Sequence, residues 1–303
     1  MKYRLLLVIF CLILCVRCYH EDSLVSTEIS EFKYTLPQGN HDYDAKILDW
    51  YERCGFYVLY KFEPKDVYWN INFWEELEKS VSSDVATGFK AEPADEAYAG
   101  DLLDIVERKF LNFYPDTMLR RCMSMKLLLC SELIQADFTR LHERGFLYGF
   151  DCLIVNYANE NITSLPSRKI DLLKDTINMS FLNRLTLTKK IAMSSEFLDV
   201  SSYDNVTVDK KNMYEKGYIA PKSGGKRKED DWKDFLKTII KTPYTTLTTE
   251  PKDGDTSFKG ILHEKKDVKG MIRKKYDILI RYFKDEYGVD LQKIGDSQEP
   301  TGE

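Results

Sequence analysis

The sequence predicts an α+β fold, with a small mixed sheet in the N-terminal half and a helical C-terminal half. Two observations predict this class. Short apolar runs of strand length, bounded by turn residues, lie in the first half of the chain. Longer segments with apolar residues at helical spacing follow in the second half. With 303 residues, 19 Tyr and 16 Phe, the chain has enough large apolar side chains for one domain over residues 41–294.

The N-terminus has the layout of a secretory signal. Basic Lys2 and Arg4 precede an apolar run over residues 5–14. This run is shorter than the about 20 residues that span a bilayer, and no other stretch approaches that length. We therefore expect residues 1–17 to be a signal peptide and the mature protein to be exported.

Cys18 follows the apolar run, and Glu21 and Asp22 come shortly after it. This arrangement resembles a lipoprotein processing site in the style of Bacteroidota, which implies a lipid on Cys18 at the head of a polar lead-in, residues 18–40. The preceding residues 15–17 are a poor lipobox, so ordinary cleavage that leaves a Cys18 thiol is the alternative. Loss of residues 1–17 changes the formal charge from −5 to −8, and no basic stripe remains, so nucleic acid is not an expected partner.

The pattern of the first half predicts two helices and three strands, in alternation with turns. We expect a helix over 42–53, capped by Asp42 or Asp44, and a helix over 95–113, ended by Pro115. Strands are expected over 56–62, ended by Pro64, and over 125–130 and 152–157. A hairpin-like segment with Gly145 and Gly149 is expected between the last two strands.

The second half predicts three helices joined by two long loops, 201–228 and 243–258. The helices are expected over 170–190, 230–241 and 268–287. The last of them is expected to begin at Asp267 as cap and to end at Gly288. The residues of the first helix expected to face inward are Leu172, Leu173, Ile177, Phe181, Leu185 and Thr188. Residues 295–303 are expected to be a polar, frayed tail.

The mature cysteines other than Cys18 are Cys54, Cys122, Cys130 and Cys152. None forms a C-x-x-C pair, which argues against a thiolate zinc site. Cys130 and Cys152 lie in apolar runs, as buried free thiols do. Export would also permit one or two disulfides, and the spacing leaves their pairing open.

Several segments, taken in order, resemble one family. They are residues 44–51 before the strand 56–62, 126–130, 195–201, 216–220, 229–235 and 275–291. The resemblance is to the zinc-binding metallopeptidase lipoproteins of Bacteroidota, which accompany outer-membrane importers and their glycan-binding lipoproteins. It implies a zincin-like fold with a helix that bears H-E-x-x-H, where two His bind zinc and the Glu acts as base.

The motif is missing from this chain. The matching helix is 170–190, and its stretch 179–188 contains neither His nor Glu. The chain has four His, at His20, His41, His142 and His263, so neither H-E-x-x-H nor H-x-x-E-H occurs anywhere. We therefore expect no catalytic and no metal-binding residues, and no cofactor. A zinc site assembled from distant His and carboxylates is left open.

Acidic residues at one predicted helix start have two explanations. Glu229, Asp230 and Asp231 loosely match an acidic-aromatic helix start that helps to complete the site in the family. Acids are also favoured there by the helix dipole, and we prefer that structural explanation. His142 and His263, each followed by Glu, are expected on the solvated surface.

These observations predict a lipid-anchored envelope protein that has lost its zinc site. Its expected role, implied by the resemblance, is binding beside an outer-membrane nutrient importer or a glycan-binding lipoprotein. Trp69, Phe73 and Trp74, with the aromatic segment 57–62, are candidates for a binding surface, although such rings more often belong to a core. The alternatives are an active but divergent zinc metallopeptidase or hydrolase, and a purely structural envelope subunit.

Overall fold

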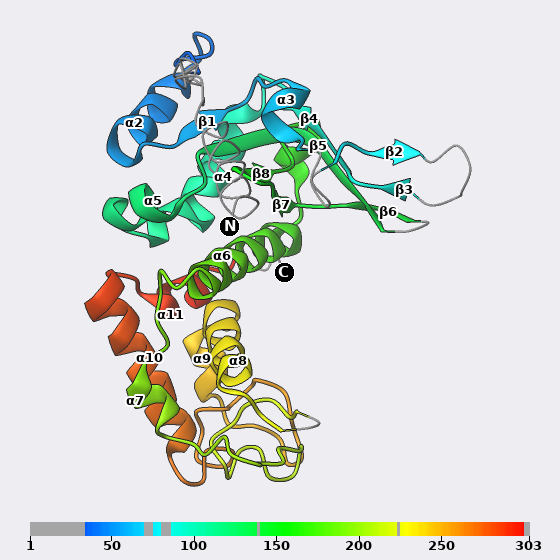
Figure 1. The fold of residues 1–303 in the computed structure, drawn as a ribbon. Helices are drawn as coiled ribbons and strands as arrows, with labels where there is room; N and C mark the ends of the chain where they lie inside the picture. Colours follow the sequence, from blue (N-terminus) through cyan, green and yellow to red (C-terminus); the bar gives the residue numbers. More distant parts are fainter. Residues whose placement is uncertain (1–33, 70–74, 80–85, 138–139, 223–224, 300–303) are drawn as a thin grey trace, which may run out of the picture. The chain divides into compact units, whose positions relative to one another are not determined.

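The fold is organised around one long strand, β5 (Lys126–Asp137), in a computed structural model that describes residues 34–69, 75–79, 86–137, 140–222 and 225–299. The first part of β5 pairs in parallel with β1 (Tyr57–Leu59) on one side and with β8 (Cys152–Val155) on the other. Its second part pairs antiparallel with β4 (Phe89–Pro93) and β6 (Arg140–Glu143). The predicted small mixed sheet in the N-terminal half is therefore confirmed (Figure 1).

The strand β7 (Phe146–Tyr148) pairs antiparallel with β8 and ends that side of the sheet order. β6 and β7 are consecutive, so the chain leaves β5, bends at Arg144 and Gly145, and continues along β8. A separate two-stranded sheet joins β2 (Glu78–Lys79) and β3 (Ala86–Thr87).

The helices of the described residues divide between the two halves of the chain. The first half has α2 (Asp44–Cys54), α3 (Pro64–Val67), α4 (Ala99–Lys109), the 3₁₀ turn η2 (Leu111–Phe113) and α5 (Asp116–Cys122). The second has the 3₁₀ turn η3 (Glu160–Ser164), α6 (Ser167–Leu187), α7 (Ser195–Leu198), α8 (Lys228–Lys241), α9 (Tyr244–Thr248), α10 (Met271–Tyr287) and α11 (Leu291–Asp296). None of these helices is long and apolar enough to cross a bilayer.

The sheet is apolar where it is parallel. Leu127, Leu128 and Leu129 on β5 and their neighbours on β8 are fully buried, as expected for strands covered on both faces. α6 packs on β7 on one side and on α8 on the other, and α8 in turn packs on α11 (Figure 1). One hydrophobic core cluster includes residues from β1, β5, β8, α6, α8 and α10, within the compact unit Leu36–Glu303.

Several predicted boundaries in the first half are wrong. The strand expected over 56–62 is only Tyr57–Leu59, because the chain turns before Pro64, which begins α3. The helix expected over 95–113 is α4 followed by η2, and Pro115 precedes a further helix, α5, that was not predicted. β5 extends seven residues beyond the expected strand end at 130, because β4 and β6 pair with its polar second part.

Neither Asp42 nor Asp44 caps α2 in the usual way. The N-cap is Tyr43, without a side-chain cap. Asp44 is nevertheless structural, because its carboxylate accepts the His41 backbone N–H at 2.8 Å and the Tyr60 hydroxyl at 3.1 Å.

The second half follows the prediction more closely. The helix expected over 170–190 is α6, and the helix expected over 230–241 is α8. α10 begins three residues later than expected, and Asp267 still serves its start, since its carboxylate accepts the N–H groups of Ile272 at 2.9 Å and Arg273 at 2.7 Å. Gly288 ends α10 in the left-handed conformation as predicted, with φ of 67°.

Two segments predicted as loops contain a helix or a small core of their own. The loop expected over 243–258 contains α9, which packs on α11. The loop expected over 201–228 builds a small core of its own from Val208, Met213 and Tyr218. The described part of the expected tail also makes contacts, since Glu299 lies 2.8 Å from the Lys109 ammonium and its N–H donates to Asp171.

Candidate functional site

The long helix α6 is the element on which the site depends, because it contains the stretch 179–188 where the motif was expected. Phe181 and Leu185 in that stretch are buried, as their spacing predicted, and Leu182 is buried beside them. Phe181 packs edge-on against Phe110 and Tyr114, with ring centroids 5.2 and 4.8 Å away. One face of the stretch is therefore a structural contact with the first half of the chain.

A buried polar contact holds the middle of α6. Asn178 is fully buried, and its side-chain amide donates to the backbone oxygens of Lys109 at 2.8 Å and Lys174 at 2.7 Å. Its Oδ1 accepts the Tyr114 hydroxyl at 2.8 Å. Asn178 heads a formal glycosylation sequon, but its burial in these bonds excludes it as an acceptor in the folded protein, unlike the exposed Asn161 and Asn205.

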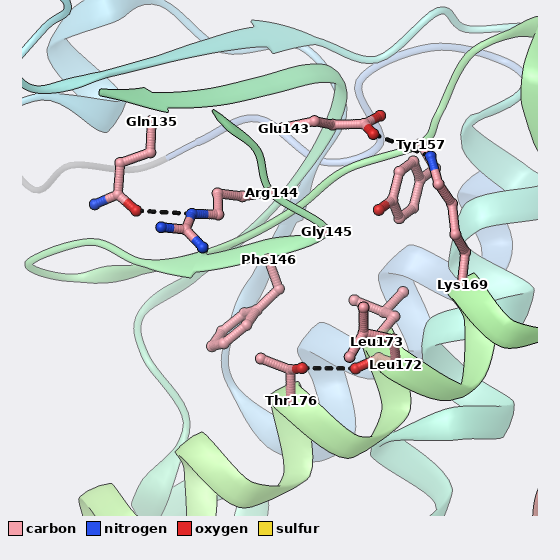
Figure 2. A pocket seen from close by; sticks show the side chains of 10 residues that line it. All are labelled: Gln135, Glu143, Arg144, Gly145, Phe146, Tyr157, Lys169, Leu172, Leu173 and Thr176. Atoms are coloured by element: carbon pink, nitrogen blue, oxygen red, sulfur yellow. Dashed lines mark hydrogen bonds and ion pairs between the residues drawn. The ribbon is translucent and has the colours of Figure 1, made fainter. Parts of the chain in front are cut away.

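A hollow of about 320 Å³ lies between the β6–β7 bend and the first half of α6 (Figure 2). Glu143 and Lys169 form an ion pair of 3.0 Å at one end of it, and Arg144 Nε donates to Gln135 at 3.0 Å at the other. The prediction that Leu172 faces inward is wrong. Its side chain is 58% exposed and lines this hollow, because β7 is too short to cover the first turns of α6.

Tyr157 forms part of the wall of the same hollow in an unusual backbone conformation, with φ of 96°. Asn156 fixes it, since Asn156 Oδ1 accepts the Tyr157 N–H at 2.8 Å and its amide donates to the Arg144 carbonyl at 2.9 Å. The ring packs so close to Gly145 that a Cβ there would lie 3.1 Å from the hydroxyl. Burial, with a smaller effect of Glu143, raises the pKa of Tyr157, so its phenol stays protonated at neutral pH.

The ten residues drawn in Figure 2 include no His, Cys or Ser, and their one carboxylate is paired with Lys169. Thr176, the aliphatic hydroxyl among them, donates to the Leu172 backbone oxygen at 2.6 Å rather than to the Glu143 carboxylate, so these residues show no nucleophile paired with a base. Polar and apolar side chains both line the hollow, and the exposed Arg144 is one of them.

A second cavity, of about 510 Å³, lies at the other end of α6. We call it the α6–α8 cavity; it is lined by Asn183, Thr186, Leu187, Lys189, Ile191, Ala192, Met193, Glu229, Trp232 and Lys233. The last turn of α6, the following loop and the first two turns of α8 supply these residues. The stretch that should carry the motif therefore does face a cavity, and Asn183 and Thr186 are the polar side chains it presents.

These residues do not fit a zinc ion. Protein zinc sites use imidazole, thiolate or carboxylate ligands, with three protein ligands in a catalytic site. The cavity wall offers one carboxylate, Glu229, together with two ammonium groups, Lys189 and Lys233. Nearby on α6, the Arg184 guanidinium lies 5.0 Å from the ring centroid of Tyr148. Within the described part of the chain, no cluster of three His, Cys, Asp or Glu could hold a metal.

The three acids at the start of α8 occupy three different environments. Glu229 is exposed beside the cavity. Asp230 receives two hydrogen bonds of 3.0 Å from Arg227, which lower its pKa to about 2. Asp231 is fully buried and binds Lys275, so burial raises its pKa while the lysine opposes the rise. They do not converge on one site.

The described histidines lie on separate elements. His41 pairs with Glu96 at 2.8 Å and stacks on Tyr43. His142 is on β6, opposite Gln135 in the β5 register. His263 accepts the Lys265 backbone N–H through Nδ1 at 3.2 Å. His20 lies outside the described residues, as does the lipid-attachment candidate Cys18.

The aromatic residues proposed for binding are divided. Val58, Leu59 and Tyr60 are fully buried, so this part of the segment 57–62 is core and the prediction of a surface there is wrong. Trp69 is 36% exposed, and its ring lies 4.5 Å from that of Phe150, which is 45% exposed. Phe73 and Trp74 lie outside the described residues.

The four described cysteines are free thiols. Cys54, Cys130 and Cys152 are buried, and Cys122 is half-buried. Burial raises the pKa of Cys54 to about 11 and that of Cys152 to about 12, so these thiols stay protonated and unreactive at neutral pH.

The protein is of the mixed α and β class, with a small mixed sheet and the long helix α6 packed between β7 and α8. A family model described as "Putative zinc-binding metallo-peptidase" matches residues 140–292, and the chain belongs to this family. The matched segment begins at β6 and includes every residue that lines the α6–α8 cavity and, apart from Gln135, every residue that lines the hollow of Figure 2.

A crystal structure of a putative zinc-binding metallo-peptidase from Bacteroides caccae is similar at 14% sequence identity, with a TM-score of 0.43. The match covers 86% of this chain and 92% of that chain. No protein with a curated description matches the sequence.

The sequence did not point to the α6–α8 cavity. The helix predicted over 230–241 contains Trp232, and the sequence assigned no binding role to Trp232 or to Leu187. The available signal was Leu187, an apolar residue near the end of a predicted helix with Lys189 and Lys190 shortly after it. The structure leaves the Leu187 side chain 82% exposed. The cavity itself depends on how α6 and α8 pack, which no local pattern specifies.

Proposed function

We propose that the protein is a binding component of the cell envelope that has kept the family's fold and lost its zinc chemistry. The observation that carries this proposal is the composition of the stretch 179–188 on α6. Asn183 and Thr186 meet the α6–α8 cavity where the family's motif would supply imidazoles, and neither side chain is a zinc ligand of the usual kind. Function resides in the site, so a fold can persist after its chemistry is lost.

The location is part of the proposal. A basic start, a ten-residue apolar run and Cys18 favour export and a lipid anchor. Lipoprotein acylation adds more than one chain, and two chains anchor a protein stably where one does not. The family resemblance favours a place at the outer membrane beside a nutrient importer, with the importer or a glycan-binding lipoprotein as partner.

Metal content tests the loss of zinc chemistry. The mature protein, purified without a His tag and dialysed against trace zinc, is expected to retain far less than one zinc per chain by elemental analysis. It is also expected to leave a mixed peptide library uncleaved. Stoichiometric zinc together with cleavage that a chelator abolishes would overturn the proposal and favour the divergent metallopeptidase.

Lipid labelling tests the anchor separately. Growth with an alkyne-tagged fatty acid is expected to label the wild-type protein and the C54S variant, and to leave the C18S variant unlabelled. Cys54 is the matched control because it is a buried thiol far along the chain from the processing site. Equal labelling of C18S and wild type would exclude Cys18 as the attachment point.

A further inference from the structure

The contact between α8 and α10 places an amine against a carboxyl group with water excluded. Lys275 Nζ lies 2.6 Å from Asp231 Oδ2, and both side chains are 0% exposed. Four aromatic rings surround Lys275 Nζ, with centroids 4.6 to 5.7 Å away, and they belong to Tyr218, Phe197, Phe235 and Tyr203. The pair is therefore enclosed by side chains on every side that these rings cover, away from solvent.

The surroundings leave this ion pair incompletely satisfied. Asp231 Oδ1 is buried and has no hydrogen-bond partner among the described residues. Two charges taken out of water recover the cost of their desolvation only when their remaining lone pairs and protons are hydrogen-bonded. Burial accordingly raises the pKa of Asp231 and lowers that of Lys275, while their mutual attraction opposes both shifts. The neutral amine and the neutral carboxylic acid are thus more accessible here than in water.

A neutral amide would suit the same surroundings better than the ion pair. The Gly217 carbonyl, 3.0 Å from Lys275 Nζ, is placed to accept an amide N–H. The Tyr203 hydroxyl, which donates to Asp231 Oδ2 at 2.7 Å, is placed to donate to the amide oxygen. The oxygen without a partner, Oδ1, is the one that would leave. Each polar group of the amide then has a partner, and the two buried charges are gone.

We propose that Lys275 and Asp231 condense into an isopeptide bond that links α10 covalently to α8. Lys275 Nζ attacks Asp231 Cγ, and the Nζ–Cγ bond forms as the Cγ–Oδ1 bond breaks. Two of the three ammonium protons leave with Oδ1 as water, and the third stays on the amide nitrogen. The charges of the ammonium and the carboxylate cancel, so the reaction needs no oxidant, reductant or other co-reactant.

Two features of the fold promote this step. The helices hold the amine against the carboxyl group, and well-oriented intramolecular reactions reach effective molarities on the order of 10⁵–10⁸ M. Tyr203 donates to the oxygen on which negative charge develops during the attack, as an oxyanion donor does. The four described cysteines are free thiols, so the amide supplies a covalent constraint that they do not. The inference goes beyond the proposed binding function and does not depend on it.

Peptide mass spectrometry of the purified mature protein, reduced, denatured and digested with trypsin, tests the bond directly. Trypsin does not cleave after a linked Lys275, so the wild type should yield a branched peptide that joins residues 229–233 to 275–281. This peptide is expected to be lighter than the two separate peptides by one water, with fragment ions that place the branch at Asp231 and Lys275. K275Q and D231A should lack the branch, whereas K274Q and E229Q, at exposed neighbouring positions, should keep it.

Y203F keeps the aromatic ring and removes the donor to Oδ2. Freshly synthesised Y203F should form the bond about a hundredfold more slowly than the wild type, the low end for loss of one oxyanion donor. Circular dichroism of Y203F checks that the variant is folded. Equal rates in the two proteins would overturn the role of Tyr203.

The wild-type digest decides the inference whether or not the variants fold. Folded wild-type protein that yields only unlinked peptides after prolonged incubation would overturn it. Loss of water within residues 229–233 without a branch, as in a succinimide at Asp231, would overturn it as well. The zinc and peptide-library measurements do not involve this bond, so a failure of this inference and a failure of the proposed function are distinguishable.

Discussion

The Lys275 ammonium lies 2.6 Å from Asp231 Oδ2, and both side chains are fully buried. Tyr203 donates its hydroxyl to the same oxygen at 2.7 Å, and Lys275 also donates to the Gly217 carbonyl at 3.0 Å. Aromatic rings enclose the ammonium, the nearest being Tyr218 with its centroid 4.6 Å away. This contact joins α8 and α10 to the loop between α7 and α8.

Breaking this pair is expected to destabilise the protein strongly. K275M leaves the Asp231 carboxylate buried without its cation, which typically costs about 3–5 kcal/mol. The double variant K275M/D231L removes both charges and should recover part of the loss. K274M, at the exposed neighbouring position, should change the free energy of unfolding by less than about 0.5 kcal/mol. Urea unfolding followed by circular dichroism measures all three, and equal values for K275M and K274M would contradict the importance of the pair.

Two adjacent leucines on α6 test how the helix is oriented. Leu173 is 4% exposed and Leu172 is 58% exposed. L173A is expected to cost about 2–5 kcal/mol, because it leaves a cavity in the core. L172A should cost less than about 0.5 kcal/mol, since this side chain lines an open hollow. The reverse order in thermal or urea unfolding would show that α6 is rotated.

The start of α10 depends on Asp267. Its carboxylate accepts two backbone N–H groups, so D267A should destabilise the protein by about 1 kcal/mol. D285A, an exposed acid near the other end of the helix, is the matched control and should be close to neutral. If D267A and D285A had the same midpoint in urea, the cap would contribute nothing to stability.

Asp230 should make stability depend on acid pH. The Arg227 hydrogen bonds lower its folded pKa to about 2 from the ordinary 3.8. A group with a depressed folded pKa contributes above its ordinary pKa, and the contribution is lost as the pH falls from about 4 toward 2. D230N should therefore cost up to about 1 kcal/mol at pH 6 and little near pH 2. Unfolding curves of the wild type and D230N across this pH range measure the difference in their stability, which is expected to shrink toward pH 2. A difference that stays constant with pH would refute the prediction.

Sequence patterning was sufficient for the elements that carry their own signal. α6, α8 and α10 have long apolar periodicities, and Gly288 with Asp267 marks the two ends of α10. Short elements were less predictable. β1 is three residues long and α3 four, so neighbouring contacts, rather than local preference, decide where they end. The polar second part of β5 has no apolar run, and pairing with β4 and β6 makes it a strand.

The sequence by itself determined the fold class, the family resemblance and the lack of an H-E-x-x-H motif, because these depend on composition, spacing and order along the chain. Only the tertiary structure decided which of three adjacent acids is buried, and that Asp231 meets a lysine 44 residues away. It also decided that Trp232 lines a cavity with the end of α6. These relationships arise from the packing of elements distant in sequence, and packing depends on three-dimensional shape, which no local pattern encodes.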